Sequence, residues 1–246
     1  MCSSKKWLTH FTQNAGIERI NWLTAPVLTT AEKNTILNSL QAWQLAETSD
    51  GIHLIRVATM YAARQKAPDY VPAIRLFIKE EQKHGNNLGR YLDIIGEKRI
   101  TKNWGDILFR KTRYFNTSME MWTITVLVVE STAQLFYQSL KEATNCPLLQ
   151  QICTDILIDE AWHIRFQSER LQVLLQEKSR AMRIIAVGMY TVFYFLTAAV
   201  VWWAHRKVFK AGRNHFSSYM QKMKFKYFRL FHGSLAVTGP LKAITV

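Results

Sequence analysis

The chain has 246 residues, of which 48% are apolar, and a formal charge of +14 at pH 7. Ten glycines and five prolines in this length suit one helical domain with an appendage, and they imply no disordered segment. The three scattered cysteines form no CxxC pair, which argues against a disulfide framework and favours a reducing compartment. The basic excess indicates an acidic partner, which could be phospholipid, nucleic acid or an acidic protein.

Residues 1–28 are predicted to form an N-terminal extension. Lys5 and Lys6 are not followed by an apolar run, so we expect no cleaved signal peptide and place the bulk of the chain in the cytoplasm.

Helical periodicity then follows in four long segments, and no alternating run suggests a strand. The predicted helices cover about 31–65, 72–95, 117–143 and 147–178. Thr29 and Glu32 offer a capping box for the first helix, and residues 96–106 read as a loop. Four long helices with one long connection, between the second and third, predict an all-α, ferritin-like four-helix bundle over residues 29–180.

Residues 184–204 carry no charge and, as a helix of about 30 Å, are long enough to cross the hydrocarbon layer of a membrane. Trp202 and Trp203, followed by basic residues, resemble an interface belt. The alternative is a buried fifth helix or a dimer face in a soluble protein. Basic residues lie on both sides, so the positive-inside rule does not choose between a single-pass span and a helix on the cytosolic face.

Residues 205–246 contain no acid, and together with the apolar helix they form a predicted C-terminal region, 181–246. Its basic residues alternate with aromatic ones, which is typical of an amphipathic helix at a lipid surface. We therefore expect membrane phospholipid as the acidic partner and no nucleic acid. The predicted location is the cytoplasmic face of the inner membrane, or otherwise the cytoplasm.

Two E-x-x-H motifs lie on two different predicted helices, Glu81 with His84 and Glu160 with His163. Residues three apart on a helix lie about 5–6 Å from each other on one face, so each motif presents a carboxylate and an imidazole to the same point. Of the seven histidines, only these two have a glutamate three residues earlier. The repetition predicts a metal site between the helices.

The two remaining helices should each add a carboxylate if a pair of metal ions is held there. Glu130 is the only charge in an apolar run of the third helix, where an unpaired carboxylate would cost several kcal/mol. On the first helix Glu47 is the best candidate, although its distance from the following turn leaves an offset of roughly 15 Å from Glu81. Asp50 is the alternative, and His53 is interpreted as an ordinary polar residue.

The predicted ligands resemble the six-ligand set of the ferritin-like di-iron carboxylate superfamily, which includes ferritins, rubrerythrins and bacterial multicomponent monooxygenases. They are Glu47, Glu81, His84, Glu130, Glu160 and His163, and the match covers about residues 31–178. The sequences EEQKH and DEAWH also resemble the D-E-x-R-H signature of the oxidase members, but Lys83 and Trp162 stand at its arginine position. The CxxC pairs of a rubredoxin module are absent.

The resemblance implies two iron ions, with manganese or a mixed Fe/Mn pair as alternatives. Four carboxylates and two neutral imidazoles suit these metals and leave the divalent pair electrically neutral. Glu80 and Asp159 are candidates to orient the ligand histidines, with solvated flanking residues as the alternative. Tyr137 and Trp162 are read as core aromatics, with electron relay as the second interpretation.

The function predicted from these patterns is an oxygen-dependent oxidoreductase, a hydroxylase, oxidase or desaturase-like enzyme, acting on an apolar small molecule at a membrane. Its partners would be dioxygen and a reductant that the sequence does not identify, and a homodimer is compatible with the sequence. The alternatives are an iron- or peroxide-handling protein like ferritin or rubrerythrin, and a membrane-anchored interaction protein with a structural metal site.

Overall fold

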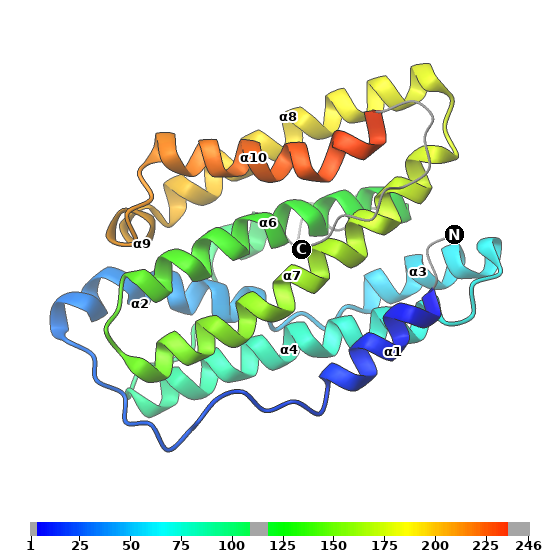
Figure 1. The fold of residues 1–246 in the computed structure, drawn as a ribbon. Coiled ribbons are helices and arrows are strands. Elements are labelled where there is room, and N and C mark those ends of the chain that lie inside the picture. The colour runs from blue at the N-terminus through cyan, green and yellow to red at the C-terminus, as the bar shows by residue number, and fades with distance from the viewer. Residues whose placement is uncertain (1–3, 109–117, 236–246) are drawn as a thin grey trace.

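A computed structural model describes residues 4–108 and 118–235, which fold into layers of long helices (Figure 1). The central bundle contains α2 (Thr30–Ala46), α3 (Ile52–Gln65), α4 (Tyr70–Ile94), α6 (Met119–Glu142) and α7 (Pro147–Gln176). No strand occurs in these described ranges. The predicted all-α, ferritin-like bundle is confirmed.

Further helices surround the bundle: α1 (Ser4–Asn14), α8 (Arg180–Ala204), α9 (Arg206–Ala211) and α10 (Phe216–Leu235). Helix α1 packs against α4 near one end of the bundle, whereas α8 and α10 lie side by side as a layer over α6 and α7 (Figure 1). The predicted apolar helix, and the basic tail as far as residue 235, are therefore helices packed on the bundle.

The starts of the bundle helices follow from local sequence. The Thr29 side chain accepts from the Glu32 backbone, and the Glu32 side chain accepts from the Thr29 backbone, which completes the predicted capping box of α2. The Ser118 hydroxyl caps α6, and Pro147 occupies the first turn of α7, where its missing N–H leaves no bond unmade.

The prediction of one continuous helix over residues 31–65 is wrong. The chain breaks between α2 and α3 because Gly51 adopts a left-handed conformation, with φ of 66°, that favours glycine. The exposed Asp50 carboxylate accepts from the Ile52 backbone at 3.1 Å and so stabilises the new start. Glu47 consequently stands at the C-terminal end of α2 rather than inside a longer helix.

Three other predicted segments differ from the structure. Residues 104–108 are helical, so the predicted loop over 96–106 ends earlier than expected. The predicted start of the third helix, near Thr117, lies outside the described residues. The N-terminal extension contains α1, whose Trp7 and Phe11 side chains are fully buried. Their burial against the bundle makes the segment part of the core.

The apolar core consists of two clusters of buried side chains, which we call the N-lobe and the C-lobe. The N-lobe joins α1 and α3 to one end of the bundle and includes Phe11, Leu54 and Phe77. The C-lobe includes Trp43 and Leu88 and extends to α8, α9 and α10. Along the chain, the buried Glu47 stands between Trp43 of the C-lobe and Leu54 of the N-lobe. The half-buried Glu81 likewise stands between Phe77 of the N-lobe and Leu88 of the C-lobe, so acidic residues occur at the boundary of the lobes.

Candidate metal centre

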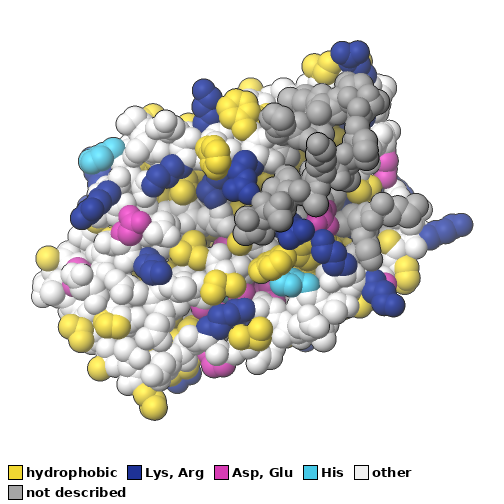
Figure 2. Space-filling view, viewed as in Figure 1, with side chains coloured by type: hydrophobic (Ala, Val, Ile, Leu, Met, Phe, Trp, Pro, Cys, Tyr) yellow, Lys and Arg dark blue, Asp and Glu magenta, His cyan; other side chains and the backbone are white. Residues whose placement is uncertain are grey.

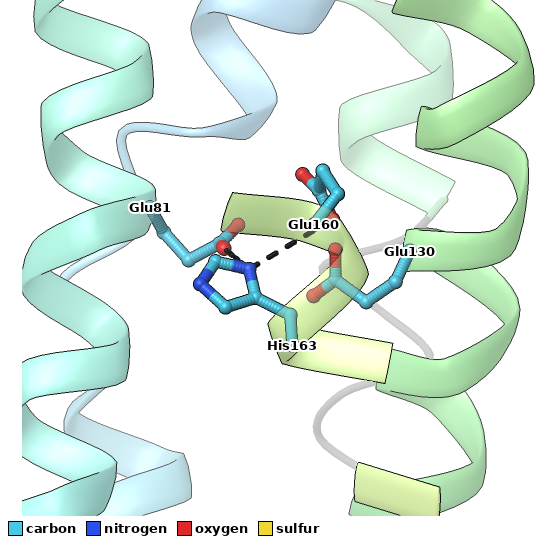
Figure 3. A group of neighbouring side chains, drawn as sticks. All are labelled: Glu81, Glu130, Glu160 and His163. Atoms are coloured by element: carbon cyan, nitrogen blue, oxygen red, sulfur yellow. Dashed lines mark ion pairs between the residues drawn. The ribbon is translucent and has the colours of Figure 1, made fainter. Parts of the chain in front are cut away.

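The six predicted ligands converge between the two lobes. Four of them, from α4, α6 and α7, point toward one another in Figure 3: Glu81, Glu130, Glu160 and His163. One ligand atom from each of these four lies within 4.8 Å of the others, and the same limit holds for a second group of Glu47, Glu81 and His84. Because Glu81 belongs to both groups, the arrangement could hold two adjoining cations with Glu81 close to both.

The break between α2 and α3 places Glu47 in this cluster. At Gly85 of α4, an added Cβ atom would lie 3.1 Å from the Glu47 Cβ atom and 3.2 Å from the Glu47 carbonyl carbon. The missing side chain of Gly85 therefore lets the end of α2 approach α4 closely. The Tyr137 hydroxyl donates to Glu47 Oε1 at 2.8 Å and fixes the carboxylate. Because of this local geometry, Glu47 does not show the offset from Glu81 that an unbroken helix would have produced.

Each histidine is oriented by the acid that immediately precedes the E-x-x-H motif of the other helix. The His84 Nε2 atom lies 3.1 Å from Asp159 Oδ2, and the His163 Nε2 atom lies 2.9 Å from Glu80 Oε2. A carboxylate in this position accepts the Nε2 proton and leaves Nδ1 as the free acceptor. Each imidazole thus turns its Nδ1 atom toward the centre, where a metal ion would bind it in place of a proton.

The inner acids, which are predicted metal ligands, differ in pKa from Asp159, which contacts His84, and the reason is electrostatic. Burial, together with the neighbouring Glu81 carboxylate, raises the pKa of Glu47 to about 8 and that of Glu160 to about 7. Burial and the adjacent Glu160 carboxylate also raise the pKa of Glu130 well above its usual range. Burial opposes ionisation of Asp159, but hydrogen bonds from His84 and other donors outweigh it and hold the Asp159 pKa well below its usual range. The inner acids retain protons that a cation would displace.

His163 responds in the opposite sense from an ordinary buried histidine. Burial lowers its pKa, but the surrounding carboxylates of Glu81, Glu160 and Glu80 outweigh burial and raise it well above the usual value. In the absence of a metal the ring is therefore held as a cation among acids. A divalent ion supplies the same positive charge and takes the place of that proton.

The unpartnered atoms at the centre match a metal site. The Nδ1 atom of His84 and both Glu160 oxygens are buried without a hydrogen bond, and His163 Nδ1 lies 2.8 Å from Glu81 Oε1 as an ion pair (Figure 3). Glu160 lies between the histidines, with Oε1 at 3.9 Å from His84 Nδ1 and Oε2 at 3.8 Å from His163 Nδ1. Buried polar atoms left unpaired in this way are costly, whereas divalent ions with oxygen and nitrogen ligands would satisfy them all.

Two residues of the N-terminal segment complete the centre and were not predicted from the sequence. Asn14, at the end of α1, donates to Glu80 Oε1 at 2.7 Å and to Asp159 Oδ1 at 2.9 Å. Arg19 bonds Asp159 at 3.1 Å, and its second nitrogen donates to Asn14. Lys83 also donates to Asp159, at 2.8 Å. No local signal in residues 1–28 indicates this role, because the contacts span more than 60 positions of sequence.

The other candidates lie outside the ligand cluster. Asp50 is exposed and binds the backbone at the start of α3, and the His53 ring lies 5.8 Å from the Trp122 ring. The Trp162 ring stacks at 4.5 Å from His10 of α1, where it joins the N-lobe. Tyr137 is fully buried and contacts the centre through Glu47.

Two apolar cavities adjoin the centre. The smaller, of about 90 Å³, is lined by the carboxylates of Glu47, Glu81 and Glu130 together with apolar side chains. The larger, of about 270 Å³, lies between α2, α6 and α8. Both are lined by Trp43, Ala46 and Val129, so they are neighbours separated by shared walls. Glu81, with 20% of its side chain accessible, faces the smaller cavity.

Comparison with known proteins supports the fold assignment. No family model and no curated protein matches the sequence. Among solved structures, a variant of an R2-like ligand-binding oxidase with an aerobically reconstituted Mn/Fe cofactor aligns with a TM-score of 0.65 and 18% identity, over 95% of this chain and 93% of that chain. An R2-like ligand-binding oxidase without metal cofactor aligns with a TM-score of 0.64 and 18% identity, over 94% and 95%. This chain thus shares the fold of the R2-like ligand-binding oxidases.

The Asp159→Asn substitution is expected to weaken metal binding about 10- to 100-fold, the range found when a carboxylate that orients a ligand histidine is lost. An amide accepts the His84 proton more weakly and leaves Asp155 as the remaining acidic partner of Lys83 and Arg19 at this position. The measurement is the dissociation constant for manganese(II) by competition with a chelator.

The matched control is Asp155→Asn, one turn earlier on α7. Asp155 also bonds Arg19, at 2.7 Å, and Lys83, but no hydrogen bond or ion pair joins it to His84 among the described contacts. We expect this control to bind manganese(II) within about threefold of the unmodified protein. Equal losses in the two variants would show that general charge, and not histidine orientation, sets the affinity.

Proposed function

We propose that this protein is an oxygen-dependent oxidoreductase with a two-metal carboxylate centre, acting on an apolar small molecule. The observation that carries the proposal is the convergence of four acids and two histidines, with unpartnered buried atoms, beside an apolar cavity. The likeness in fold to oxidases carrying a Mn/Fe cofactor supports it further. The bound pair would be two iron ions or one iron and one manganese ion.

The ligands fit this role by charge as well as by position. Four carboxylates offset two divalent ions, so the buried centre becomes neutral only when both are present. Such a redox-active pair supplies electrons for the reduction of dioxygen. The protein contributes the ligand geometry, the two orienting acids and a dry enclosure. A reductant must restore the centre after each cycle.

The residues also define where an apolar substrate would lie. A small reactant such as dioxygen fits the 90 Å³ cavity beside Glu81, and the 270 Å³ cavity approaches the volume of ordinary small-molecule sites. The larger cavity is lined mainly by apolar side chains, including Phe193, Leu196 and Val200 of α8. This lining selects an aliphatic or aromatic body rather than a charged one.

Membrane association remains part of the proposal. Helix α8 is long and apolar enough to cross a bilayer, and 28% of its most apolar window is buried against the protein. A location at the cytoplasmic face of a membrane would bring the larger cavity close to lipid-soluble molecules. The same length and composition also suit a helix that lies on a surface.

The test is oxygen uptake by protein loaded anaerobically with iron(II), then exposed to oxygen with decane, dodecanoate or a short-chain ubiquinone. We expect about two iron ions per chain and an oxidised organic product, identified by mass spectrometry with isotopically labelled oxygen. A different set of results would instead assign the protein to iron handling. Oxygen uptake would then match the amount of iron oxidised, iron loading would far exceed two ions per chain, and no organic product would form.

A further inference from the structure

The outer face of the α8–α10 layer carries a continuous apolar stripe. Along α8 its members recur every three or four residues, which places them on one side of the helix. The stripe consists of Ile185, Met189, Val192, Leu196, Val200 and Trp203, with exposed fractions between 42% and 65%. On α10, Phe225 and Phe228 are exposed to a similar degree. Apolar exposure of this extent marks an interaction surface.

Basic residues border this apolar surface throughout. No acidic residue occurs after Glu177, whereas Arg180 and Arg183 begin α8 and Arg206 follows it. On α10, Lys224 lies 5.9 Å from the Phe228 ring and Arg229 lies 5.9 Å from the Phe225 ring. Figure 2 shows Lys and Arg side chains interspersed with hydrophobic ones over this side of the molecule. Such pairing of cations with exposed aromatic rings suits the boundary between lipid headgroups and acyl chains.

The opposite face of α8 is anchored to the bundle. Val187, Tyr190, Tyr194 and Ala198 are buried, and the Tyr194 hydroxyl donates to the Met223 carbonyl of α10 at 3.3 Å. A helix that crossed the bilayer would have to leave these contacts. Its polar bonds to α10 would then face hydrocarbon, where unpaired polar groups are strongly disfavoured.

The chain after α8 also returns to the same bundle. Val208 and Phe209 of α9 are fully buried. At Gly212 an added Cβ atom would lie 2.4 Å from the Ser139 carbonyl oxygen, so the end of α9 touches the α6 backbone. Both ends of α8 are therefore held on one side of any membrane that its stripe contacts.

We propose that the α8–α10 face docks on an anionic lipid bilayer, with α8 lying in the interface and not crossing it. The stripe enters the headgroup and acyl boundary, and the basic residues bind the anionic headgroups. Charge selects this occupant over a second copy of the chain, because two such faces would bring together basic groups with no acid to pair them.

Docking would also connect the membrane to the larger cavity. Leu196 and Val200 belong both to the stripe and to the cavity lining. An apolar molecule could pass from the lipid phase to the cavity without crossing water. This consequence rests on the proposed oxidase function, whereas docking itself requires only the α8–α10 face.

Vesicle flotation of the full chain tests the proposal, with vesicles of two parts phosphatidylcholine to one part phosphatidylglycerol. We expect binding to these vesicles, loss of binding in high salt, and far less binding to phosphatidylcholine alone. The Lys224→Gln/Arg229→Gln variant should bind about 25-fold more weakly, at roughly fivefold for each basic residue removed. Metal-free protein should bind equally, so a failed metal centre would leave this result intact.

The apolar part is tested by Met189→Glu/Leu196→Glu, which should abolish flotation. Its control, Leu23→Glu/Ile52→Glu, changes exposed apolar residues elsewhere and should float normally. Circular dichroism checks that both variants fold. Undiminished flotation of the stripe variant, or resistance of the bound protein to alkaline extraction, would overturn the proposal. So would a lipid-free dimer that this variant converts to monomers, since a second copy would then cover the face.

Discussion

The Glu130→Gln substitution is expected to reduce bound iron from about two ions per chain to less than one and to abolish oxygen-dependent turnover. The amide has nearly the same shape but cannot supply the charge that a divalent ion requires from this buried position. Glu130 comes from α6, across the cluster from Glu81 of α4, so its loss opens one side of the cluster (Figure 3). Metal content by mass spectrometry and oxygen uptake measure the two effects.

The same variant should be more stable than the unmodified chain when both lack metal. Glu130 is buried beside Glu160 and its pKa is raised well above the usual range, so at neutral pH the fold must either desolvate its charge or bind a proton. A neutral amide does not incur this penalty, so the free energy of unfolding of the metal-free variant should rise by about 1–3 kcal/mol. If the variant gains stability without metal but loses metal binding, Glu130 is a metal ligand and not an ordinary core residue.

Glu142→Gln is the matched control, because it makes the same change on the same helix at an exposed position. Glu142 only accepts from Gln138, at 2.7 Å. Iron content, turnover and stability should all remain close to those of the unmodified protein. If Glu130→Gln kept its full iron content, the assigned centre would be wrong.

The stability of the metal-free protein is expected to fall as the pH rises from about 5 to 8. Burial raises the pKa of Glu160 to about 7 and that of Glu47 to about 8, both from an ordinary value of 4.5. Between these limits the folded chain holds protons that the unfolded chain has released, so stability declines with pH. Each of these raised pKa values corresponds to several kcal/mol of stability that is lost across this range of pH.

The charges of His163 and Asp159 do not reverse this trend. The raised pKa of His163 also makes the folded state hold an extra proton above the unfolded value, so its contribution is lost as pH rises. The depressed pKa of Asp159 changes stability only in more acidic solution, below the window. All the inner groups therefore favour the metal-free fold at the lower pH.

Bound metal should reverse the dependence of stability on pH. Cations displace protons from the same groups, so manganese(II) should stabilise the fold more strongly at pH 8 than at pH 5.5. Thermal melts with and without manganese(II), at both pH values, provide the measurement. Glu47→Gln should flatten part of the metal-free slope while keeping an acceptor for Tyr137. A metal-free melting temperature that increased with pH would contradict the assigned pKa values.

Local helical spacing was sufficient to predict most of the side chains that the structure brings together at the candidate centre. The E-x-x-H pairs and Glu130 were recognisable because residues on one helical turn share a face wherever the helix is placed. The capping box at Thr29 was likewise a local signal. The break at Gly51 was missed because apolar periodicity continues across it, and only the left-handed backbone reveals the interruption.

The N-terminal contribution could not be predicted for a different reason. Asn14 and Arg19 acquire their role only when α1 packs on the bundle and brings them to Glu80 and Asp159. Nothing in their own neighbourhood distinguishes them from surface residues. The exposed stripe of α8 was visible in the sequence as an apolar run, but its division into a buried and an exposed face needed the packed structure.

The placement of the centre between the N-lobe and the C-lobe has a consequence for how the molecule comes apart. Without metal, the seam between the lobes holds protonated acids and the charged His163, with several buried atoms left unpaired. We therefore expect each lobe of the metal-free protein to open with its own free energy. Two bound cations would join residues of α2, α4, α6 and α7 across the seam, so we expect amide hydrogens on either side of it to exchange together only in the loaded protein.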